Sequence, residues 1–234
     1  MGTLPVSEQF GPTLQGEGPH AGRAVQFLRL MGCNLSCAWC DTPYTWDGSR
    51  FDLRAEGKPT DAADIIAALI PGVPLVVSGG EPLLHQHSTA FARVLSYARW
   101  SECEVHVETN GTIMPADHIA PLVDTFAVSP KLPHAGGHRG HQNPALHPGW
   151  AAVARTHRDT FLKVVVQRPE EVEFVAAWAD RLRWPASRVW VMPEGTDAAT
   201  LLDRWPAIAT AAAVYGINAT QRLHVLAWGD TKGT

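Results

Sequence analysis

The chain has little charge, few cysteines and no long apolar run. Of its 234 residues, 18% are charged and four are cysteine, and the formal net charge is −4. Such a chain lacks the basic surface on which most nucleic-acid-binding proteins depend. Its longest apolar stretch, residues 65–77, contains two prolines and a glycine and is too short to span a bilayer. We therefore expect it to bind neither nucleic acid nor membranes.

The first ten residues also lack the basic and apolar regions of a secretory signal, so we expect a cytoplasmic protein. In that reducing compartment, clustered cysteines are metal ligands or catalytic groups more often than disulfides. Hydrophobic residues make up 45% of the chain, and its length suffices for one full core. We expect one domain over 1–234, with an N-terminal segment 1–24, a core 25–192 and a C-terminal helix and strand in 193–234.

Short β-branched runs alternate with helical patterns along the chain. We expect strands over 24–30, 75–77, 104–107, 125–128, 161–166, 189–192 and 223–227. We expect helices over 60–70, 88–100, 115–123, 170–182 and 196–215, the last interrupted at Pro206. Strands this uniformly apolar are typical of a parallel sheet covered by helices. About six strand–helix units fit, so we expect an α/β fold with a partial, open-sided (β/α)6 TIM-like barrel; a doubly wound open sheet is the alternative.

The cysteines are distributed as three plus one. Cys33, Cys37 and Cys40 form CxxxCxxC directly after the first apolar strand. Three close thiolates can hold three irons of a 4Fe–4S cluster and leave the fourth iron open to a ligand. Zinc would need a fourth ligand, and Cys103, which we expect to be a small buried hydrophobe, is remote. Zinc and three structural cysteines remain the alternatives.

Further motifs also directly follow expected strands. Residues 78–82, Ser-Gly-Gly-Glu-Pro, follow one strand, and the Glu-Thr-Asn-Gly of 108–111 and the Ser-Pro-Lys of 129–131 follow the next two. In a parallel barrel these positions converge at the carboxyl ends of the strands, where active sites lie. Adjacent glycines let a backbone approach a ligand closely, although on its own Gly-Gly-Glu-Pro could be an ordinary turn.

Together, CxxxCxxC and Gly-Gly-Glu-Pro in this order resemble the radical S-adenosylmethionine superfamily. Within that superfamily, the chain resembles the 7-carboxy-7-deazaguanine synthases. This resemblance rests on residues 12–18, 27–35, 40–46, 108–111, 129–131 and 222–230. The segments Pro-Thr-Leu-Gln-Gly-Glu-Gly and Cys-Asp-Thr-Pro-Tyr-Thr-Trp are the more specific ones, because the cysteine motif also occurs in glycyl-radical activating enzymes.

The resemblance implies a lyase of queuosine or 7-deazapurine biosynthesis. Its reaction would convert 6-carboxy-5,6,7,8-tetrahydropterin into 7-carboxy-7-deazaguanine with loss of ammonia. The implied cofactors are a 4Fe–4S cluster, S-adenosylmethionine and Mg2+. The resemblance also implies a homodimer and an external one-electron donor of the flavodoxin or ferredoxin type.

The resemblance assigns roles to individual residues. Cys33, Cys37 and Cys40 would hold the cluster, and Thr42 would bind Mg2+. Cofactor binding would fall to Ser78, Gly79, Gly80, Glu81, Glu108, Asn110, Ser129 and Lys131. Substrate binding would fall to Gln15, Gly16, Glu17, Arg29, Ser78 and His224.

Several of these assignments have a structural alternative. Arg29 lies in an apolar strand, where an unpaired guanidinium is costly to bury, so it faces either a substrate carboxylate or a structural acid. Glu17 is either an acceptor for an aminopyrimidine edge or a turn acid, and Thr42 is either a Mg2+ ligand or a turn hydroxyl. His224, expected in a strand, either contacts substrate or is structural.

Residues 131–149 form a long Gly, Pro and His loop, of the kind that is either a functional lid or disordered. Its four histidines, at positions 134, 138, 141 and 147, are irregularly spaced, and we do not expect them to bind a metal. We expect Trp39 to shield the cluster from solvent and Trp46 to pack beside the substrate entrance.

Two other functions compete with the deazapurine-forming enzyme. An activating enzyme that makes a glycyl radical on a partner protein shares CxxxCxxC but has no use for residues 12–18 and 40–46. A non-catalytic metal-binding or electron-transfer module would not need Gly-Gly-Glu-Pro. The number and order of the motifs favour the deazapurine-forming enzyme.

Overall fold

The computed structural model describes residues 2–138, 141–142, 145–157 and 159–234. Its main feature is a nine-stranded sheet with the spatial order β11-β10-β9-β6-β5-β4-β2-β1-β3. The strands of this sheet are β1 (Thr3–Leu14), β2 (Ala24–Leu30), β3 (Lys58–Asp61), β4 (Leu75–Gly79), β5 (Val105–Thr109), β6 (Thr125–Val128), β9 (Asp159–Val166), β10 (Val189–Pro193) and β11 (Asn218–Ala219). A separate hairpin pairs β7 (Gly137–His138) with β8 (His141–Gln142).

The strands β2, β4, β5, β6, β9 and β10 are parallel and follow one another in space in chain order. A doubly wound sheet reverses its strand order at a switch point, whereas a barrel does not. Here the strand order does not reverse, and the sheet has two edges, at β11 and β3. Both features match the open-sided barrel expected from the sequence.

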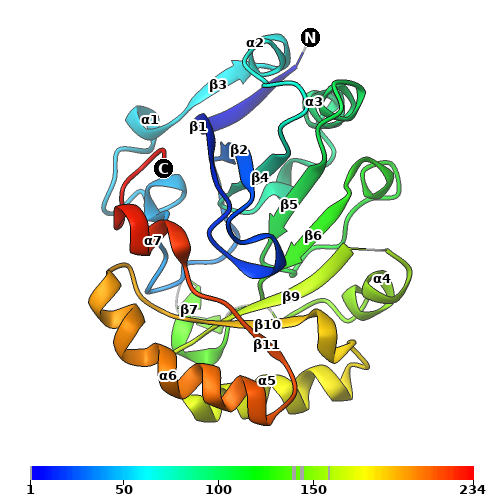
Figure 1. The fold of residues 1–234 in the computed structure, drawn as a ribbon. Coiled ribbons are helices and arrows are strands. Elements are labelled where there is room, and N and C mark those ends of the chain that lie inside the picture. The colour runs from blue at the N-terminus through cyan, green and yellow to red at the C-terminus, as the bar shows by residue number, and fades with distance from the viewer. Residues whose placement is uncertain (1, 139–140, 143–144, 158) are drawn as a thin grey trace.

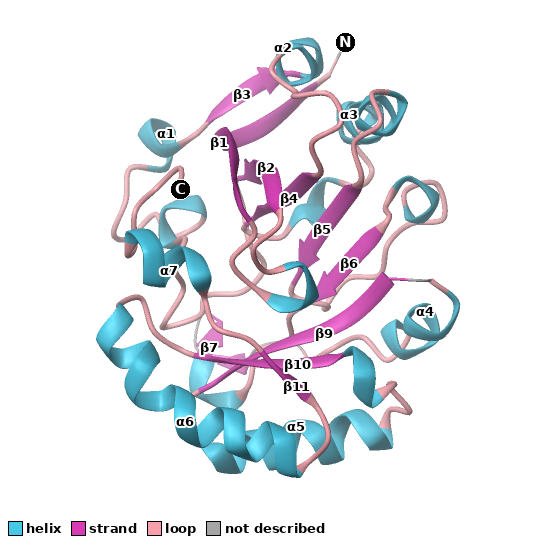
Figure 2. Cartoon of the chain, viewed as in Figure 1, coloured by secondary structure: helices cyan, strands magenta, loops and turns pink. Residues whose placement is uncertain are grey.

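The helices are α1 (Leu53–Glu56), α2 (Ala62–Ala67), α3 (Thr89–Trp100), α4 (Trp150–Thr156), α5 (Pro169–Arg181), α6 (Ala198–Val214) and α7 (Leu223–Trp228). Helices α2 to α6 surround the sheet on its outer side, and α7 lies across the opposite, inner side near the C-terminus (Figures 1 and 2). This arrangement leaves the carboxyl ends of the strands accessible from the inner side. Among the described residues, no helix is long and apolar enough to cross a membrane.

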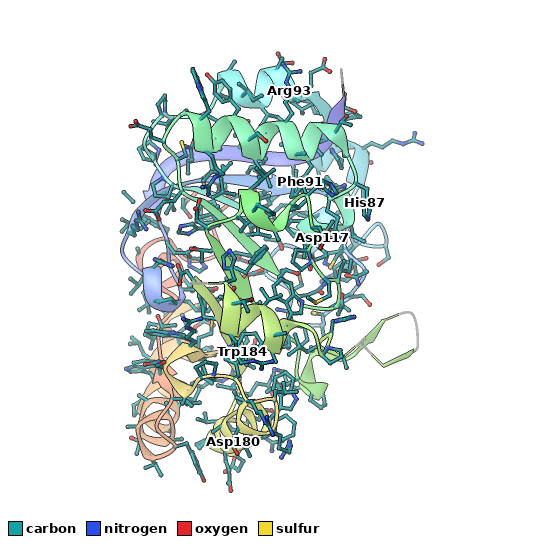
Figure 3. The ribbon with its side chains drawn as sticks, turned by 90° about the vertical axis from the view of Figure 1, so that its right-hand side faces the viewer. His87, Phe91, Arg93, Asp117, Asp180 and Trp184 are labelled. Atoms are coloured by element: carbon teal, nitrogen blue, oxygen red, sulfur yellow. The ribbon has the colours of Figure 1, made fainter. Side chains whose placement is uncertain are left out.

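Alternate residues of each strand point to opposite sides of the sheet. The outward residues join the main core against the helices and include Leu28, Val77, Val107 and Val164. On the helix side, Phe91 of α3 points toward the sheet and is buried, whereas Arg93 points away into solvent (Figure 3). The inward residues are partly polar and include Arg29, Ser78, Glu108 and Lys163, which line a pocket.

An antiparallel strand, β1, was not expected from the sequence. It pairs with β2, with Glu8 opposite Arg29, and with β3 on its other side. Its polar residues and the Gly11–Pro12 step interrupt the alternation that would predict a strand. The segment that follows, residues 15–23, turns back over the inner side of the sheet (Figure 1).

Three other expectations about secondary structure were wrong. Residues 223–227 form helix α7 and not a strand, because a five-residue apolar run carries no decisive periodicity. Of the helix expected over 115–123, only the 3-10 turn Ala120–Leu122 forms, since Pro121 removes a backbone donor from the interior of that segment. Helix α6 continues through the exposed Pro206 without interruption, and the short α4 was not expected.

Candidate active site

The three clustered cysteines line one pocket of about 100 Å3 directly after β2. In the described chain all four cysteines are free, and Cys103 is buried elsewhere, with its thiol 3.4 Å from the carbonyl oxygen of Ile70. Burial raises the pKa of all three clustered thiols, that of Cys33 to about 12. A bound cation reverses this effect and deprotonates a coordinating thiol. The geometry therefore separates the cysteines into three plus one, as expected.

The end of β4 packs backbone to backbone against the cysteine loop. A Cβ atom on Gly80 would lie 1.9 Å from the carbonyl oxygen of Gly32, and one on Gly79 would lie 2.2 Å from that of Leu30. Only glycine fits at either position, because the obstructing atoms are backbone. The two glycines thus bring the motif of residues 78–82 to the edge of the cysteine pocket.

Glu81 connects this motif to the next strand. Its carboxylate is fully buried and accepts hydrogen bonds from the backbone N–H of Leu83 at 3.0 Å, the hydroxyl of Thr109 at 2.9 Å and the backbone N–H of Asn110 at 2.7 Å. Burial raises the pKa of Glu81 to about 7 against the opposing effect of these donors. The contacts that the structure gives Glu81 are therefore structural; its cofactor-binding role stays a prediction.

A second pocket, of about 360 Å3, adjoins the first. The two share Trp39, Asp41, Thr42, Gly79, Gly80 and Lys131. The larger pocket is lined by nearly every residue that the sequence analysis assigned to substrate or cofactor: Gln15, Gly16, Glu17, Arg29, Thr42, Ser78, Gly79, Gly80, Glu108, Asn110, Ser129, Lys131 and His224. Segments that are far apart in the sequence thus meet at one site, at the carboxyl ends of the strands.

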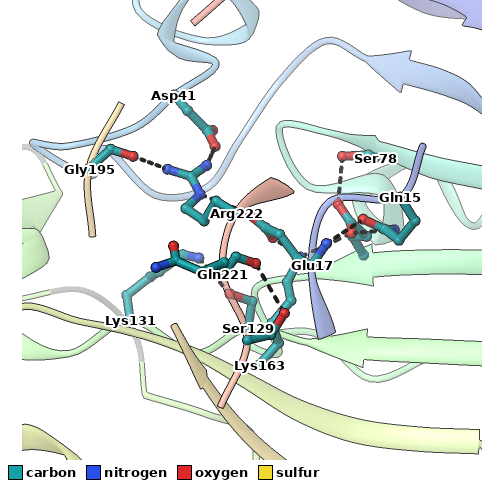
Figure 4. Close-up of polar contacts among 12 residues, drawn as sticks. Gln15, Glu17, Asp41, Ser78, Ser129, Lys131, Lys163, Gly195, Gln221 and Arg222 are labelled. Atoms are coloured by element: carbon teal, nitrogen blue, oxygen red, sulfur yellow. Dashed lines mark hydrogen bonds and ion pairs between the residues drawn. The ribbon is translucent and has the colours of Figure 1, made fainter. Parts of the chain in front are cut away.

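A network of buried ion pairs forms one wall of this pocket (Figure 4). Lys163 on β9 lies 2.6 Å from Glu17 and 3.0 Å from Glu108, measured between Nζ and carboxylate oxygens. Arg222, just before α7, donates from Nε to Glu17 at 2.8 Å and also pairs with Asp41. Burial opposes the charge on Glu17, but Lys163 and Arg222 outweigh it and hold the pKa of Glu17 well below its usual range.

Arg29 has a protein partner as well as a place in the pocket. Its Nε lies 2.8 Å from a carboxylate oxygen of Glu8, the residue opposite it on β1, and the Tyr44 hydroxyl donates to the same oxygen at 2.7 Å. All three side chains are at least half-buried. The structural acid considered for Arg29 is thus present, and Arg29 still lines the pocket.

Residues 29–140 match the Radical SAM superfamily. A 7-carboxy-7-deazaguanine synthase of Pyrobaculum aerophilum is 34% identical over 222 residues, which cover 94% of this chain and 93% of that protein. The synthase of Bacillus subtilis is 31% identical over 249 residues, covering 98% of each chain. The chain belongs to the 7-carboxy-7-deazaguanine synthase family.

The fold of this family member also matches solved structures. QueE from Escherichia coli has a TM-score of 0.65 and covers 95% of both chains at 21% identity. Streptococcus suis SuiB bound to S-adenosylmethionine has a TM-score of 0.56 and covers 82% of this chain and 48% of its own. These structures support the fold assignment, an α/β fold built on a mostly parallel sheet.

Membership of the radical SAM superfamily implies a 4Fe–4S cluster and S-adenosylmethionine, and the cysteine pocket of this synthase-family chain fits both. Three free thiols line one small pocket, and that pocket shares Gly79, Gly80 and Lys131 with the larger one. The indole N–H of Trp46 donates to Cys40 Sγ at 3.3 Å. An N–H donor to a ligating sulfur stabilises its negative charge.

The two tryptophans near the cysteines differ from each other. Trp39 lines both pockets, and the Lys131 ammonium lies 5.4 Å from its ring centre. Trp46 lines the cysteine pocket, where its indole N–H is directed at Cys40. Its expected place beside the substrate entrance stays a prediction.

His224 reaches the site from a different element than expected. It lies on helix α7, and its ring packs directly on the backbone of Gly16. Burial lowers the pKa of His224, so the neutral imidazole is favoured. One atom each of His224, Glu17 and Asp41 lie within 4.8 Å of one another, and Arg222 forms ion pairs with both acids.

The hydroxyl of Thr42 lies between the two pockets. It donates to the carbonyl oxygen of Gly79 at 3.4 Å and lies 3.7 Å from Cys40 Sγ. Thr42 precedes a 3-10 turn, Pro43–Thr45, and its side chain makes no capping hydrogen bond to that turn. Thr42 therefore does not cap this turn, and its role as a Mg2+ ligand stays a prediction.

The remaining predicted residues lie as follows. Lys131 donates to the Ser129 hydroxyl at 2.9 Å, and Asn110 donates from its side chain to Asn34 at 2.8 Å. In the loop of residues 131–149, His134 pairs with Glu171 at 3.0 Å and His147 accepts from the backbone of Gly149 at 3.1 Å. The side chains at positions 138 and 141 lie outside the described residues.

Sequence reasoning did not select Lys163, Arg222, Asp41, Glu8 or Tyr44, all of which line the pocket or hold its residues. For Lys163 a signal existed. It is the single charged residue in the apolar run 160–166. Arg29 was selected because an unpaired charge in an apolar strand is costly to bury, and the same reasoning applies to Lys163. For Asp41 and Glu8 the signal would have been weak, because acids of this kind are common at exposed turns and strand edges.

Proposed function

We propose that the chain converts 6-carboxy-5,6,7,8-tetrahydropterin into 7-carboxy-7-deazaguanine, with loss of ammonia, as a radical S-adenosylmethionine lyase. One observation carries the proposal: the pocket that gathers the substrate and cofactor candidates adjoins the pocket of the three cysteines and shares lining residues with it. A radical generated at the cysteine pocket would act on a molecule held beside it. The relatives named 7-carboxy-7-deazaguanine synthase match the chain over nearly its whole length.

Cys33, Cys37 and Cys40 would hold the cluster, and the segment of Gly79 and Gly80 would bind S-adenosylmethionine at its edge. When bound, these groups would supply the radical chemistry needed for hydrogen abstraction at C6 of the pterin. The residues around them would orient the ligand. Ser129 and Lys131, which contact one another, complete the cofactor side of the pocket.

The substrate side of the pocket suits an anionic heterocycle with polar edges. Arg29 would bind the carboxylate, since a guanidinium matches it in two parallel hydrogen bonds. Glu17, held ionised by its two cations, would accept hydrogen bonds from the amino edge. Gln15, Gly16, Ser78 and His224 would contact the ring. Thr42 would contribute one oxygen to a Mg2+ ion that otherwise binds substrate oxygens and water, as this hard cation prefers.

The proposal extends to the protein's surroundings. We propose a cytoplasmic homodimer that receives single electrons from a flavodoxin or ferredoxin. Its product would enter queuosine or another 7-deazapurine pathway. We treat residues 1–234 as a single domain, with the segment before β2 contributing to substrate binding.

Anaerobic reconstitution tests the proposed function. The protein should bind about four irons and form 7-carboxy-7-deazaguanine from the pterin in the presence of S-adenosylmethionine, Mg2+ and a reductant. Absence of product from protein with an intact cluster would contradict the proposal. Release of 5′-deoxyadenosine that requires a glycyl-radical partner protein and not the pterin would favour an activating enzyme instead.

A further inference from the structure

Lys163 is a buried cation at the centre of the pocket wall. It lies on β9 among buried apolar residues, and only 6% of its side chain is exposed. An ammonium in such a place is strongly destabilising unless acids pair with it. Its Nζ lies 2.6 Å from Glu17 and 3.0 Å from Glu108 (Figure 4). Lys163 thereby connects the loop after β1 to the end of β5.

The two carboxylates beside Lys163 act as hydrogen-bond acceptors. A carboxylate has about four acceptor positions. Glu17 uses one position for Lys163 and one for Arg222. The donors to Glu108 are Lys163 at 3.0 Å, Ser78 at 3.1 Å and Gln15 at 3.4 Å. Both acids therefore keep acceptor capacity toward the pocket that they line.

Lys163 itself keeps one donor. An ammonium has three N–H groups, and the two carboxylates take two of them. Burial lowers the pKa of Lys163, but Glu108 and Glu17 outweigh it and raise the pKa, so the ammonium stays charged. Lys163 lines the pocket, and its third N–H has no partner among the residues that the structure describes. The pocket wall therefore presents three hydrogen-bonding groups: an acceptor on Glu17, a donor on Lys163 and an acceptor on Glu108.

We propose that Lys163 is a specificity-determining residue that, with Glu17 and Glu108, binds a heterocycle edge in which two N–H groups flank a ring-nitrogen acceptor. This inference rests on the proposed function, because the reduced pterin has such an edge in N8–H, N1 and the 2-amino group. The 7-deazaguanine product has the same order in N9–H, N3 and the 2-amino group. One set of contacts therefore holds the ring before and after its contraction.

A comparison of two substrates tests the proposal. One is 6-carboxytetrahydropterin, and the other is its 1-deaza analogue, in which CH replaces the N1 acceptor. In the wild-type enzyme, kcat/KM for the analogue should be about 10- to 100-fold lower, because the Lys163 donor is left unpaired in the complex. In Lys163→Met, kcat/KM for the pterin should fall by a similar factor. The kcat/KM values for the two substrates should then be nearly equal. If the role of Lys163 were purely structural, the variant would lower kcat/KM for both substrates by the same factor, and the ratio of the two kcat/KM values would be preserved.

Lys163→Met leaves two neighbouring acids without their shared cation, which can prevent folding. The double variant Lys163→Met/Glu108→Gln removes one charge of each sign and provides a second test of the same ratio. Lys58→Met, at an exposed lysine on β3, is the matched control and should retain the wild-type ratio. Iron content and thermal melting establish that each variant is folded.

The outcomes separate this inference from the proposed function. If the wild-type enzyme converts the pterin and its preference over the 1-deaza analogue survives in both Lys163 variants, the inference is overturned and the function stands. If wild-type protein with a complete cluster does not convert the pterin, the proposed function itself fails.

Discussion

Gly16 and His224 are in such close contact that a Cβ atom on Gly16 would lie 1.9 Å from Nδ1 of the imidazole. The carbonyl oxygen of Gly16 also accepts a hydrogen bond from the backbone N–H of Leu223 at 2.9 Å. The loop after β1 and the start of α7, more than 200 residues apart in the chain, are therefore fitted to each other at the pocket. The identity of residue 16 determines where the ring of His224 lies.

We predict that Gly16→Ala displaces His224 from the pocket wall without unfolding the protein, because the obstructing atoms belong to a side chain that can rotate. Misplacement of a contacting group by about 1 Å can cost on the order of 100-fold in rate. We therefore expect kcat/KM for the pterin to fall about 10- to 100-fold with an unchanged melting temperature. Gly48→Ala, at an exposed position whose added Cβ would lie 3.4 Å from its nearest neighbour, is the control and should remain active. Unchanged kinetics in Gly16→Ala would show that the position of His224 is unimportant.

Gly80→Ala should act on the cluster instead. Its Cβ would lie 1.9 Å from the carbonyl oxygen of Gly32 and 3.0 Å from the backbone nitrogen of Cys33, and no side chain can move to relieve these contacts. The loop that carries Cys33 must shift. We expect iron content after reconstitution to fall to well below half of about four per chain, as measured by iron and sulfide analysis. Full iron loading in Gly80→Ala would contradict this close packing of β4 and the cysteine loop.

The cysteine motif could be predicted from the sequence because its chemistry depends on local spacing alone. The pocket was predictable only in part. Motifs that follow parallel strands must converge, but the partner of each charged side chain is set by tertiary packing. Lys163 illustrates the limit: the sequence shows a lysine in an apolar strand, and nothing local indicates that its partners are Glu17 and Glu108.

The secondary structure shows the same limit. Six of the parallel strands, β2, β4, β5, β6, β9 and β10, were predicted because their apolar, β-branched runs alternate with helical patterns along the chain. The short apolar run 223–227 was wrongly assigned, since its helix depends on contacts with the loop after β1 and not on its own pattern. Strand β1 was missed because it is stabilised by pairing on both sides, with β2 and β3, despite its polar and Gly-Pro residues.

Trp46→Phe should change the reduction potential of the cluster and leave its assembly intact. The indole N–H donates to Cys40 Sγ at 3.3 Å, and such a bond stabilises the more negative, reduced cluster. Loss of about 1 kcal/mol corresponds to a potential about 40 mV more negative for a one-electron couple. Redox titration monitored by electron paramagnetic resonance measures this shift. Trp100→Phe, at a tryptophan that is 75% exposed, is the control, and an equal potential in both variants would contradict the assigned role of Trp46.

Asp159 should make the free energy of unfolding depend on pH in the acid range. Its carboxylate lies 2.9 Å from His20 and accepts from the Thr125 hydroxyl at 2.6 Å, which fixes the segment of residues 15–23 over the sheet. Burial raises the pKa of Asp159, but His20 and Thr125 outweigh it and lower the pKa to about 2 from its usual value of 3.8. The folded state thus favours the ionised form. The resulting stabilisation is complete above about pH 4 and is lost as the pH falls toward 2.

Because Asp159 is only half-buried, we expect this contribution to the free energy of unfolding to be about 1 kcal/mol. Urea unfolding of Asp159→Asn, followed by circular dichroism between pH 2 and 6, should show a flatter decline toward acid pH than the wild-type protein. Asp117→Asn, at an exposed aspartate, is the control and should follow the wild-type profile. If Asp159→Asn and wild type declined in parallel, the pair with His20 would contribute nothing to stability. In that case the segment of Gln15 and Glu17 would be held in place by its other contacts, which include the ion pairs of Glu17 with Lys163 and Arg222.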